Sequence, residues 1–159
     1  MTAILLDTNI LVYVFDLAEI NKRAQAVTII RELQNRSLGC LSIQCLSEFF
    51  NATTLGTSPK LTINAALQYV QDYLQAYPTF PLTQSIVLEA ARGVRDYSFS
   101  FYDAQIWSSA LINDVPVIFS EDFSDGKTME GVRFVNPFTE TFELEKWISL
   151  LTTNPKSGA

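Results

Sequence analysis

Short, mainly apolar segments separated by longer segments with helical spacing are the feature that most constrains the fold of this chain. Residues 3–6 form a continuous apolar run that stops at Asp7, and further strands are expected at residues 115–120 and 132–135. Continuous runs of this length are typical of strands buried on both faces. Because they alternate with helical segments, the sequence predicts a single α/β domain with a central, mostly parallel sheet of four to five short strands flanked by helices.

The remaining elements follow from apolar periodicity and from turn residues. Further extended segments are expected at residues 38–42 and around Phe80, between Pro78 and Pro81. Helices are expected at residues 9–15, 21–36, 43–55, 63–76, 84–97, 101–113 and 141–151. The domain is thus expected to span residues 1–151, and residues 152–159 are expected to form a disordered tail.

The composition excludes several kinds of chemistry. The 159 residues include no histidine, which excludes Ser-His-Asp triads, histidine general bases and histidine metal ligands. Cys40 and Cys45 are expected to be free buried thiols, because the chain shows no secretory signal. No apolar run approaches the roughly 18 residues that a membrane span requires, so the protein is expected in the cytoplasm, away from membranes.

The charge balance is unusual for a protein that acts on nucleic acid. The chain has 17 acidic and 11 basic residues, a net charge of -6 and an isoelectric point of about 4.5. Nucleic-acid-binding domains usually carry a basic surface instead. Part of the excess would be explained if the acids at positions 7, 48, 103, 122 and 125 form a metal site. The other 12 acidic residues would then nearly balance the 11 basic ones.

Three of these acids fall where predicted strands end. Asp7 closes the first strand, and Asp122 and Asp125 follow the strand that ends near Ser120. The carboxyl ends of the strands in an open parallel sheet form its ligand-binding edge, so these acids are expected on one rim. The structural alternatives are a helix cap for Asp7 and ordinary turn positions for the other two. Asp122, closer to its strand, is expected to be the ligand and Asp125 to contribute less, whereas Glu121 is interpreted as a solvated loop residue.

Two further acids lie on helices beside apolar side chains. Glu48 borders an apolar helix face next to Phe49, where a glutamate is costly to bury unless it is paired or bound to a cation. Asp103 heads an apolar stripe that continues through Trp107. The alternatives are a solvated edge position for Glu48 and a capping arrangement of Asp103 with Ser100.

Carboxylates gathered without basic partners or histidines point to a particular chemistry. They call for hard divalent cations with oxygen ligands, Mg²⁺ or Mn²⁺. Such ions lower the pKa of bound water and stabilise the attacking and leaving oxygens of phosphodiester cleavage. The residues therefore predict a metal-dependent phosphodiester hydrolase whose catalytic acids are Asp7, Glu48, Asp103 and Asp122.

At these acids the sequence resembles the PIN-domain family and, within it, the VapC-type toxins of toxin–antitoxin pairs. Four segments between about residues 3 and 138 carry the resemblance: 4–11 around Asp7, 47–49 around Glu48, 99–110 around Asp103 and 118–126 around Asp122. The resemblance implies that the metal ligands are Asp7, Asp103 and Asp122, with Glu48 and Asp125 as additional acids. It also implies that Thr8, Asn9 and Ser120 support the site.

The resemblance further implies an activity and partners. It implies an endoribonuclease that cleaves single-stranded RNA with Mg²⁺ or Mn²⁺, forms a homodimer and is inhibited by a small antitoxin protein. By their proximity in sequence, Arg92, Arg95 and Lys127 are the candidate contacts to RNA phosphates. Solvated surface charge is the alternative role for each of them.

Other protein classes fit the sequence less well. A dehalogenase-type phosphatase also begins with a strand that ends in Asp. It requires a second Asp where this chain has Asn9, and a lysine for which there is no suitable counterpart here. A flavodoxin-like binding module would need a Gly-rich phosphate loop after the first strand. The alternative function is a non-catalytic PIN-like scaffold that binds RNA or protein, although all four acids are present.

Overall fold

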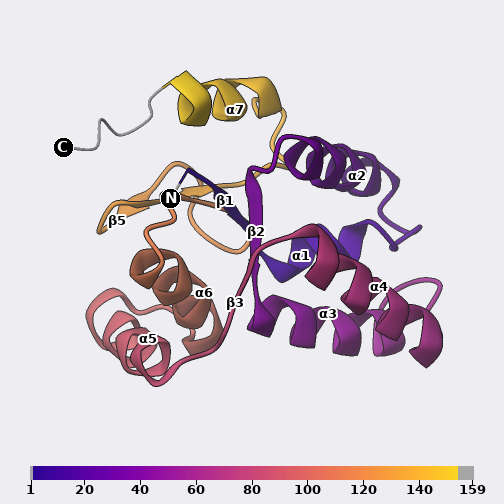
Figure 1. Cartoon of the computed structure of the whole chain (residues 1–159), viewed down its shortest axis with the longest axis horizontal. Helices are drawn as coiled ribbons and strands as arrows, with labels where there is room; N and C mark the ends of the chain where they lie inside the picture. Colours follow the sequence, from indigo (N-terminus) through magenta and orange to yellow (C-terminus); the bar gives the residue numbers. More distant parts are fainter. Residues whose placement is uncertain (1, 154–159) are drawn as a thin grey trace.

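The computed structural model describes residues 2–153, which form a six-stranded sheet between two layers of helices (Figure 1). The strands are β1 (Ile4–Leu6), β2 (Gly39–Ser42), β3 (Thr79–Phe80), β4 (Val117–Phe119), β5 (Thr128–Met129) and β6 (Val132–Val135). The helices are α1 (Thr8–Tyr13), α2 (Ile20–Asn35), α3 (Ile43–Leu55), α4 (Ile63–Ala76), α5 (Gln84–Tyr97), α6 (Phe101–Ile112) and α7 (Leu144–Thr153). The predicted fold class, a single α/β domain with a mostly parallel sheet, is confirmed.

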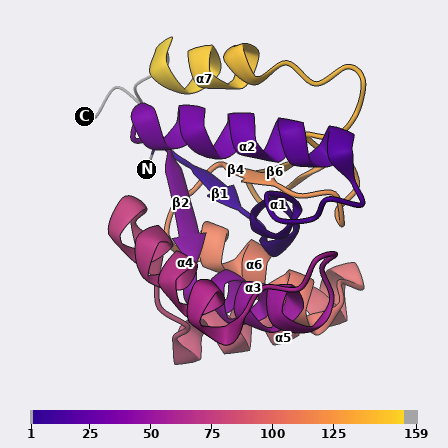
Figure 2. The same cartoon turned by 90° about the vertical axis from the view of Figure 1, so that its right-hand side faces the viewer.

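The helices cover both faces of the sheet. In the two perpendicular views, α2 and α7 lie on one side of the strands, and α3, α5 and α6 lie on the other (Figure 1, Figure 2). Helix α4 packs against α3, and α5 packs along α6. β1, β2 and β4 are therefore buried along their whole length, whereas the exposed Arg133 interrupts the buried residues of β6.

The strand order places the end of β1 at a natural binding position. The order is β3-β2-β1-β4-β6-β5, and only β5 pairs antiparallel, against β6. All three residues of β1 are fully buried, and Leu6 is in register with Phe119 of β4. The chain extends the sheet to one side of β1 through β2 and to the other side through β4. Ligands of open α/β sheets bind at the carboxyl edge where the strand order reverses in this way.

Four helices begin directly after a Ser or Thr residue that caps their first turn. The side chains of Ser42, Thr62, Thr83 and Ser100 each accept a hydrogen bond from the backbone N–H three residues later, at the starts of α3, α4, α5 and α6. Each bond satisfies a donor that the first turn leaves unpaired. The bounds predicted for α3, α4 and α5 are confirmed.

Two expectations about the sheet need correction. It has six strands rather than four or five, because a hairpin joins β5 to β6, with Glu130 and Gly131 at positive φ in the turn. The strand expected at residues 115–120 narrows to β4. At its start, the backbone N–H of Val115 bonds to the carbonyl of Ala110 near the end of α6 instead of joining the sheet.

The C-terminal helix and the cysteines were also predicted. Helix α7 reaches Thr153, so the first two residues of the expected disordered tail are helical. Residues 154–159 lie outside the described residues. Cys40 and Cys45 are free and buried, as predicted. Within residues 2–153 no helix has the length and apolar character needed to cross a membrane.

Candidate metal centre

Asp7 is a buried carboxylate at the carboxyl end of β1. Its side chain is 4% exposed. Oδ1 accepts a hydrogen bond from the backbone N–H of Thr8 at 2.7 Å, and Oδ2 accepts one from the hydroxyl of Ser120 at 2.6 Å. Burial raises the pKa of Asp7 to about 7, against the two hydrogen bonds that lower it, and the charges of Asp122 and Glu48 raise it further. Asp7 also caps α1, so its structural and candidate functional roles coexist.

Ser120 joins the end of β4 to the end of β1. Besides donating to Asp7, its Oγ accepts hydrogen bonds from the backbone N–H of Asp122 at 3.0 Å and from Nδ2 of Asn9 at 3.3 Å. The same Nδ2 also lies 3.1 Å from Oδ2 of Asp122. The side-chain carbonyl oxygen of Asn9 is buried and has no hydrogen-bond partner among the described residues. The hydrogen bonds of Ser120 and Asn9 therefore hold two of the predicted ligands at one edge.

Glu48 reaches the same edge from α3 and is half-buried. Its Oε2 accepts a hydrogen bond from the hydroxyl of Thr8 at 3.3 Å, and its Oε1 accepts one from Nε2 of Gln44 at 2.6 Å. Gln44 also donates to the backbone carbonyl of Tyr102 at 3.1 Å, which ties α3 to the first turn of α6. Glu48 is thus oriented by side chains from two elements and is not a freely solvated helix residue.

Asp103 lies in the first turn of α6, where Ser100 caps its backbone N–H. The predicted capping arrangement is therefore present. Asp122 is exposed at the surface, yet desolvation by the neighbouring protein raises its pKa. The hydrogen bond from Asn9 lowers that pKa, and the charge of Asp103 raises it. Asp103 is therefore near enough to Asp122 for its charge to raise that pKa, although no hydrogen bond among the described residues joins it to the other three acids.

A buried aromatic side chain anchors the loop that carries Asp122. Phe123 stacks on Phe134 of β6, with ring centroids 4.2 Å apart, and meets Phe99 edge to face at 5.7 Å. Because Phe123 directly follows Asp122, its close packing limits the positions that the Asp122 backbone can adopt.

Lys22 is a basic residue near the site that the sequence did not reveal. Its ammonium group donates hydrogen bonds to Glu121 at 2.8 Å and to the hydroxyl of Tyr13 at 3.1 Å, and that hydroxyl also bonds to Glu121. Its charge favours the ionised form of Asp122 and so lowers the pKa of that carboxyl. The expectation that Glu121 is a solvated loop residue is wrong. Lys22 and Glu121 are far apart in the chain, so no local pattern could have paired them.

Asp125 and Lys127 belong to the loop that follows Asp122 and precedes β5. The carboxylate of Asp125 accepts a hydrogen bond from the backbone N–H of Asn136 at 2.8 Å, which fastens the loop to the end of β6. Lys127 is exposed and follows in the same loop. No hydrogen bond in the described chain joins Asp125 to the other acids, so the structure gives it a loop-anchoring contact.

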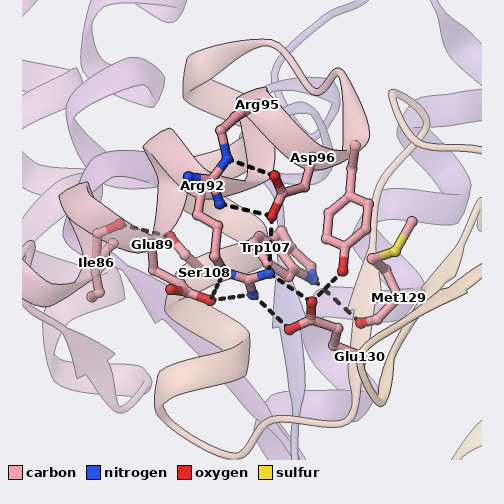
Figure 3. A network of polar contacts seen from close by, with 10 residues as sticks. Ile86, Glu89, Arg92, Arg95, Asp96, Trp107, Ser108, Met129 and Glu130 are labelled. Carbon is pink, nitrogen blue, oxygen red and sulfur yellow. Dashed lines mark hydrogen bonds and ion pairs between the residues drawn. The ribbon is translucent and has the colours of Figure 1, made fainter.

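Arg92 and Arg95 belong to a separate network (Figure 3). Arg92 on α5 contacts three carboxylates: Glu89, Asp96 at 3.6 Å and Glu130 at 2.6 Å. Arg95 pairs with Asp96 at 2.6 Å. Because Glu130 is in the β5–β6 turn, Arg92 ties α5 to that hairpin. These ion pairs agree with the alternative that both arginines carry surface charge. Within the described residues, neither arginine forms an ion pair with Asp7, Glu48, Asp103 or Asp122.

The donor set at the edge of the sheet fits a hard divalent cation. All side chains that meet there present oxygen, and Asp7 is a carboxylate buried without a cationic partner of its own. Asn9 turns its Nδ2 toward Ser120 and Asp122, and its carbonyl oxygen is buried without a partner among the described residues. Within residues 2–153, no three acidic or cysteine side chains already lie close enough together to hold an ion. The edge is therefore a group of candidate ligands, not a formed coordination sphere.

The fold and this acidic edge together define an α/β domain with candidate metal ligands at the carboxyl edge of its parallel sheet. The family model described as PIN domain matches residues 4–124, so the chain belongs to the PIN-domain family. The matched region contains all four acids, from Asp7 to Asp122. No curated protein matches the sequence.

Solved structures share the fold at low sequence identity. A toxin–antitoxin complex from Klebsiella pneumoniae aligns with a TM-score of 0.60 and 17% identity, over 85% of this chain and 98% of that one. VapC20 from Mycobacterium tuberculosis, described as a toxin that cleaves the sarcin-ricin loop, aligns with a TM-score of 0.61 and 18% identity, over 82% and 99%. DNA-bound VapBC from Salmonella typhimurium aligns with a TM-score of 0.60 and 18% identity, over 86% and 99%. At these identities the likeness establishes the fold.

Proposed function

We propose that this protein is a Mg²⁺- or Mn²⁺-dependent endoribonuclease that cleaves single-stranded RNA and acts as the toxin of a toxin–antitoxin pair. One observation carries the proposal. Asp7 is buried at the end of β1, and Glu48 and Asp122 lie close enough to raise its pKa. Such a cluster is unfavourable by itself, and a divalent cation would stabilise it.

The candidate ligands are held by hydrogen bonds from neighbouring side chains. In this proposal Asp7, Asp103 and Asp122 hold the ion and Glu48 completes the site. Ser120 and the amide of Thr8 orient Asp7, and Gln44 orients Glu48. A divalent ion bound there would supply the charge that stabilises the attacking and leaving oxygens of a phosphodiester. These contacts leave the carboxylates little freedom to move during the reaction, which favours catalysis.

The proposed partners follow from the similar structures. Two of them are complexes that contain an antitoxin, which supports a small antitoxin as the partner of this chain in the cytoplasm. A homodimer is also proposed. The acidic edge would favour an antitoxin segment that carries a basic side chain. Co-expression with the neighbouring reading frame should yield a stable complex and relieve growth arrest; the absence of both effects would contradict the toxin role.

The alternative is a non-catalytic PIN-like scaffold that binds RNA or protein, and metal dependence of cleavage distinguishes the two functions. Purified protein should cleave single-stranded RNA with Mg²⁺ or Mn²⁺ and should lose this activity in EDTA. Asp7→Asn, Glu48→Gln and Asp103→Asn should each remove most of the activity. Asp72→Asn, an exposed change on α4, is the matched control and should remain active. Undiminished cleavage in excess chelator would contradict the metal mechanism, and no cleavage under any condition would favour the scaffold.

A further inference from the structure

A cavity of about 720 Å³ opens directly beside the candidate metal centre. Thr8 and Glu48, which belong to the acidic edge, form part of its wall. Ile43 on α3 and Tyr102 and Gln105 on α6 form other parts. The volume lies in the range of small-molecule sites. A group bound in this cavity would therefore lie next to the carboxylates.

The charge of the wall restricts what the cavity can hold. No lysine or arginine lines it, and Glu48 is its one carboxylate. A phosphate group would be repelled there rather than bound. Exposed apolar side chains, Ile43 and Leu82, lie beside the amides of Asn51 and Gln105. This combination suits an uncharged planar group that has hydrogen-bonding atoms along its edge.

Gln105 is a largely buried residue of the cavity wall. It is 6% exposed, and no hydrogen bond of its side-chain amide is found among residues 2–153. The fully buried side-chain atoms that lack a partner in the described chain are in Asn9 and Ser109, so the amide atoms of Gln105 keep contact with solvent, and a ligand can replace the water there. Gln44, which lines the same cavity, is different because its Nε2 already donates to Glu48 and to the carbonyl of Tyr102. The amide of Gln105 is therefore available to a ligand, as is the amide of the exposed Asn51.

Tyr102 supplies a surface for stacking. Its side chain is 66% exposed although it is aromatic. It lies three residues before Gln105 on α6, so both side chains share one face of the helix. Aromatic side chains stack on unpaired bases, and amides hydrogen-bond to base edges, in the recognition of single-stranded RNA.

We propose that this cavity binds one unpaired base of the RNA substrate, with the base on the ring of Tyr102 and its edge on the amide of Gln105. The cavity then sets the base preferred next to the cleaved phosphate. This inference rests on the proposed ribonuclease function. It assigns specificity to residues outside the four acids.

The test compares cleavage sites in a pool of single-stranded RNA of random sequence, incubated with Mg²⁺ and sequenced at the new ends. The wild type should prefer particular bases at one position near the cut. Gln105→Leu should reduce that preference about fivefold or more, as expected when an amide that reads a base edge is lost. Tyr102→Ala should raise KM about fivefold or more, and Tyr102→Phe should keep the wild-type KM because the ring remains.

The controls separate this inference from the proposed function. Gln75→Leu, an exposed change on α4 away from the cavity, should leave the base preference unchanged. If the wild type cleaves RNA but Gln105→Leu folds and keeps the same preference, the inference is wrong and the ribonuclease proposal stands. Weakened antitoxin binding by Tyr102→Ala with unchanged cleavage would assign the cavity to a protein partner and also overturn the inference. If the wild type cleaves no RNA, both proposals fail.

Discussion

The hydroxyl of Ser120 donates a 2.6 Å hydrogen bond to Oδ2 of Asp7, although the two residues are 113 positions apart in the chain. The bond crosses from the end of β4 to the end of β1, two strands that are in register at Leu6 and Phe119. The same oxygen of Ser120 accepts hydrogen bonds from Asn9 and from the backbone of Asp122. The hydroxyl of Ser120 thus links Asp7 and Asp122, the two candidate ligands that follow strands.

The first prediction concerns this hydroxyl. Ser120→Ala removes the hydroxyl that donates to Asp7 and that accepts from Asn9 and from the backbone of Asp122. The carboxylates of Asp7 and Asp122 should therefore be held less firmly in position. We expect kcat to fall about tenfold, which corresponds to about 1.4 kcal/mol. The Mg²⁺ concentration for half-maximal cleavage should rise as well. A metal titration of RNA cleavage measures both effects.

Ser109→Ala is the matched control for that prediction. The Ser109 hydroxyl is also buried, but it has no hydrogen-bond partner among the described residues. Its removal should leave cleavage unchanged and stability equal or slightly higher, because an unsatisfied buried group is lost. Equal activity losses in the two variants would contradict the role given to Ser120.

The second prediction concerns the pH dependence of stability without metal. The folded state holds the pKa of Asp7 at about 7, above its ordinary value of 3.8. The resulting contribution to stability is complete below about pH 4 and is lost as pH rises through 7, because ionisation then costs more in the folded state. In EDTA, the free energy of unfolding should fall by a few kcal/mol between pH 4 and pH 8. Urea unfolding at a series of pH values measures this change.

Asp7→Asn tests the assignment of that pH dependence. The variant lacks the ionising group, so its free energy of unfolding should depend less on pH and should exceed that of the wild type at pH 8 in EDTA. Added Mg²⁺ should stabilise the wild type and not the variant, because binding to the folded state alone shifts the unfolding equilibrium. Identical pH profiles for the two proteins would show that another group is responsible.

The third prediction separates the two acids of the β4–β5 loop. The carboxylate of Asp122 accepts a hydrogen bond from Asn9 at the acidic edge, whereas that of Asp125 accepts one from the backbone N–H of Asn136. At saturating Mg²⁺, Asp122→Asn should lower kcat at least about tenfold, or about 1.4 kcal/mol. Asp125→Asn keeps an oxygen that can accept from Asn136, and it should retain most of kcat with a modest loss of metal affinity. An inactive Asp125→Asn beside a near-normal Asp122→Asn would reverse the assignment.

The fourth prediction concerns Arg92, which the sequence made a candidate RNA contact. Its guanidinium is engaged with Glu89, Asp96 and Glu130 and lies 5.4 Å from the ring centre of Trp107. Arg92→Gln should therefore lower the melting temperature by a few degrees and change kcat/KM for RNA less than about twofold. Arg31→Gln, an exposed change on α2, is the control for loss of charge and should affect neither quantity. An unchanged melting temperature combined with weaker RNA binding would restore the role of Arg92 as an RNA contact.

The sequence by itself determined the elements whose signals are local. The bounds of α3, α4 and α5 could be predicted because an apolar period follows a Ser or Thr that caps the first turn. The position of Asp7 at the rim followed from a buried strand that ends in an acid. The candidate set of four acids was likewise available from the sequence, since each acid adjoins a strand end or an apolar helix face.

The tertiary structure alone decided which side chains meet. The short β5 pairs only because a turn returns it to β6, and two residues carry too little local pattern to predict a strand. The contact of Ser120 with Asp7, the pairing of Lys22 with Glu121 and the burial of Gln105 beside Glu48 all join distant segments. Such contacts depend on how the strands align and how the helices pack across the sheet. Many core residues together contribute the free energy of that packing, so no single position in the sequence predicts these contacts.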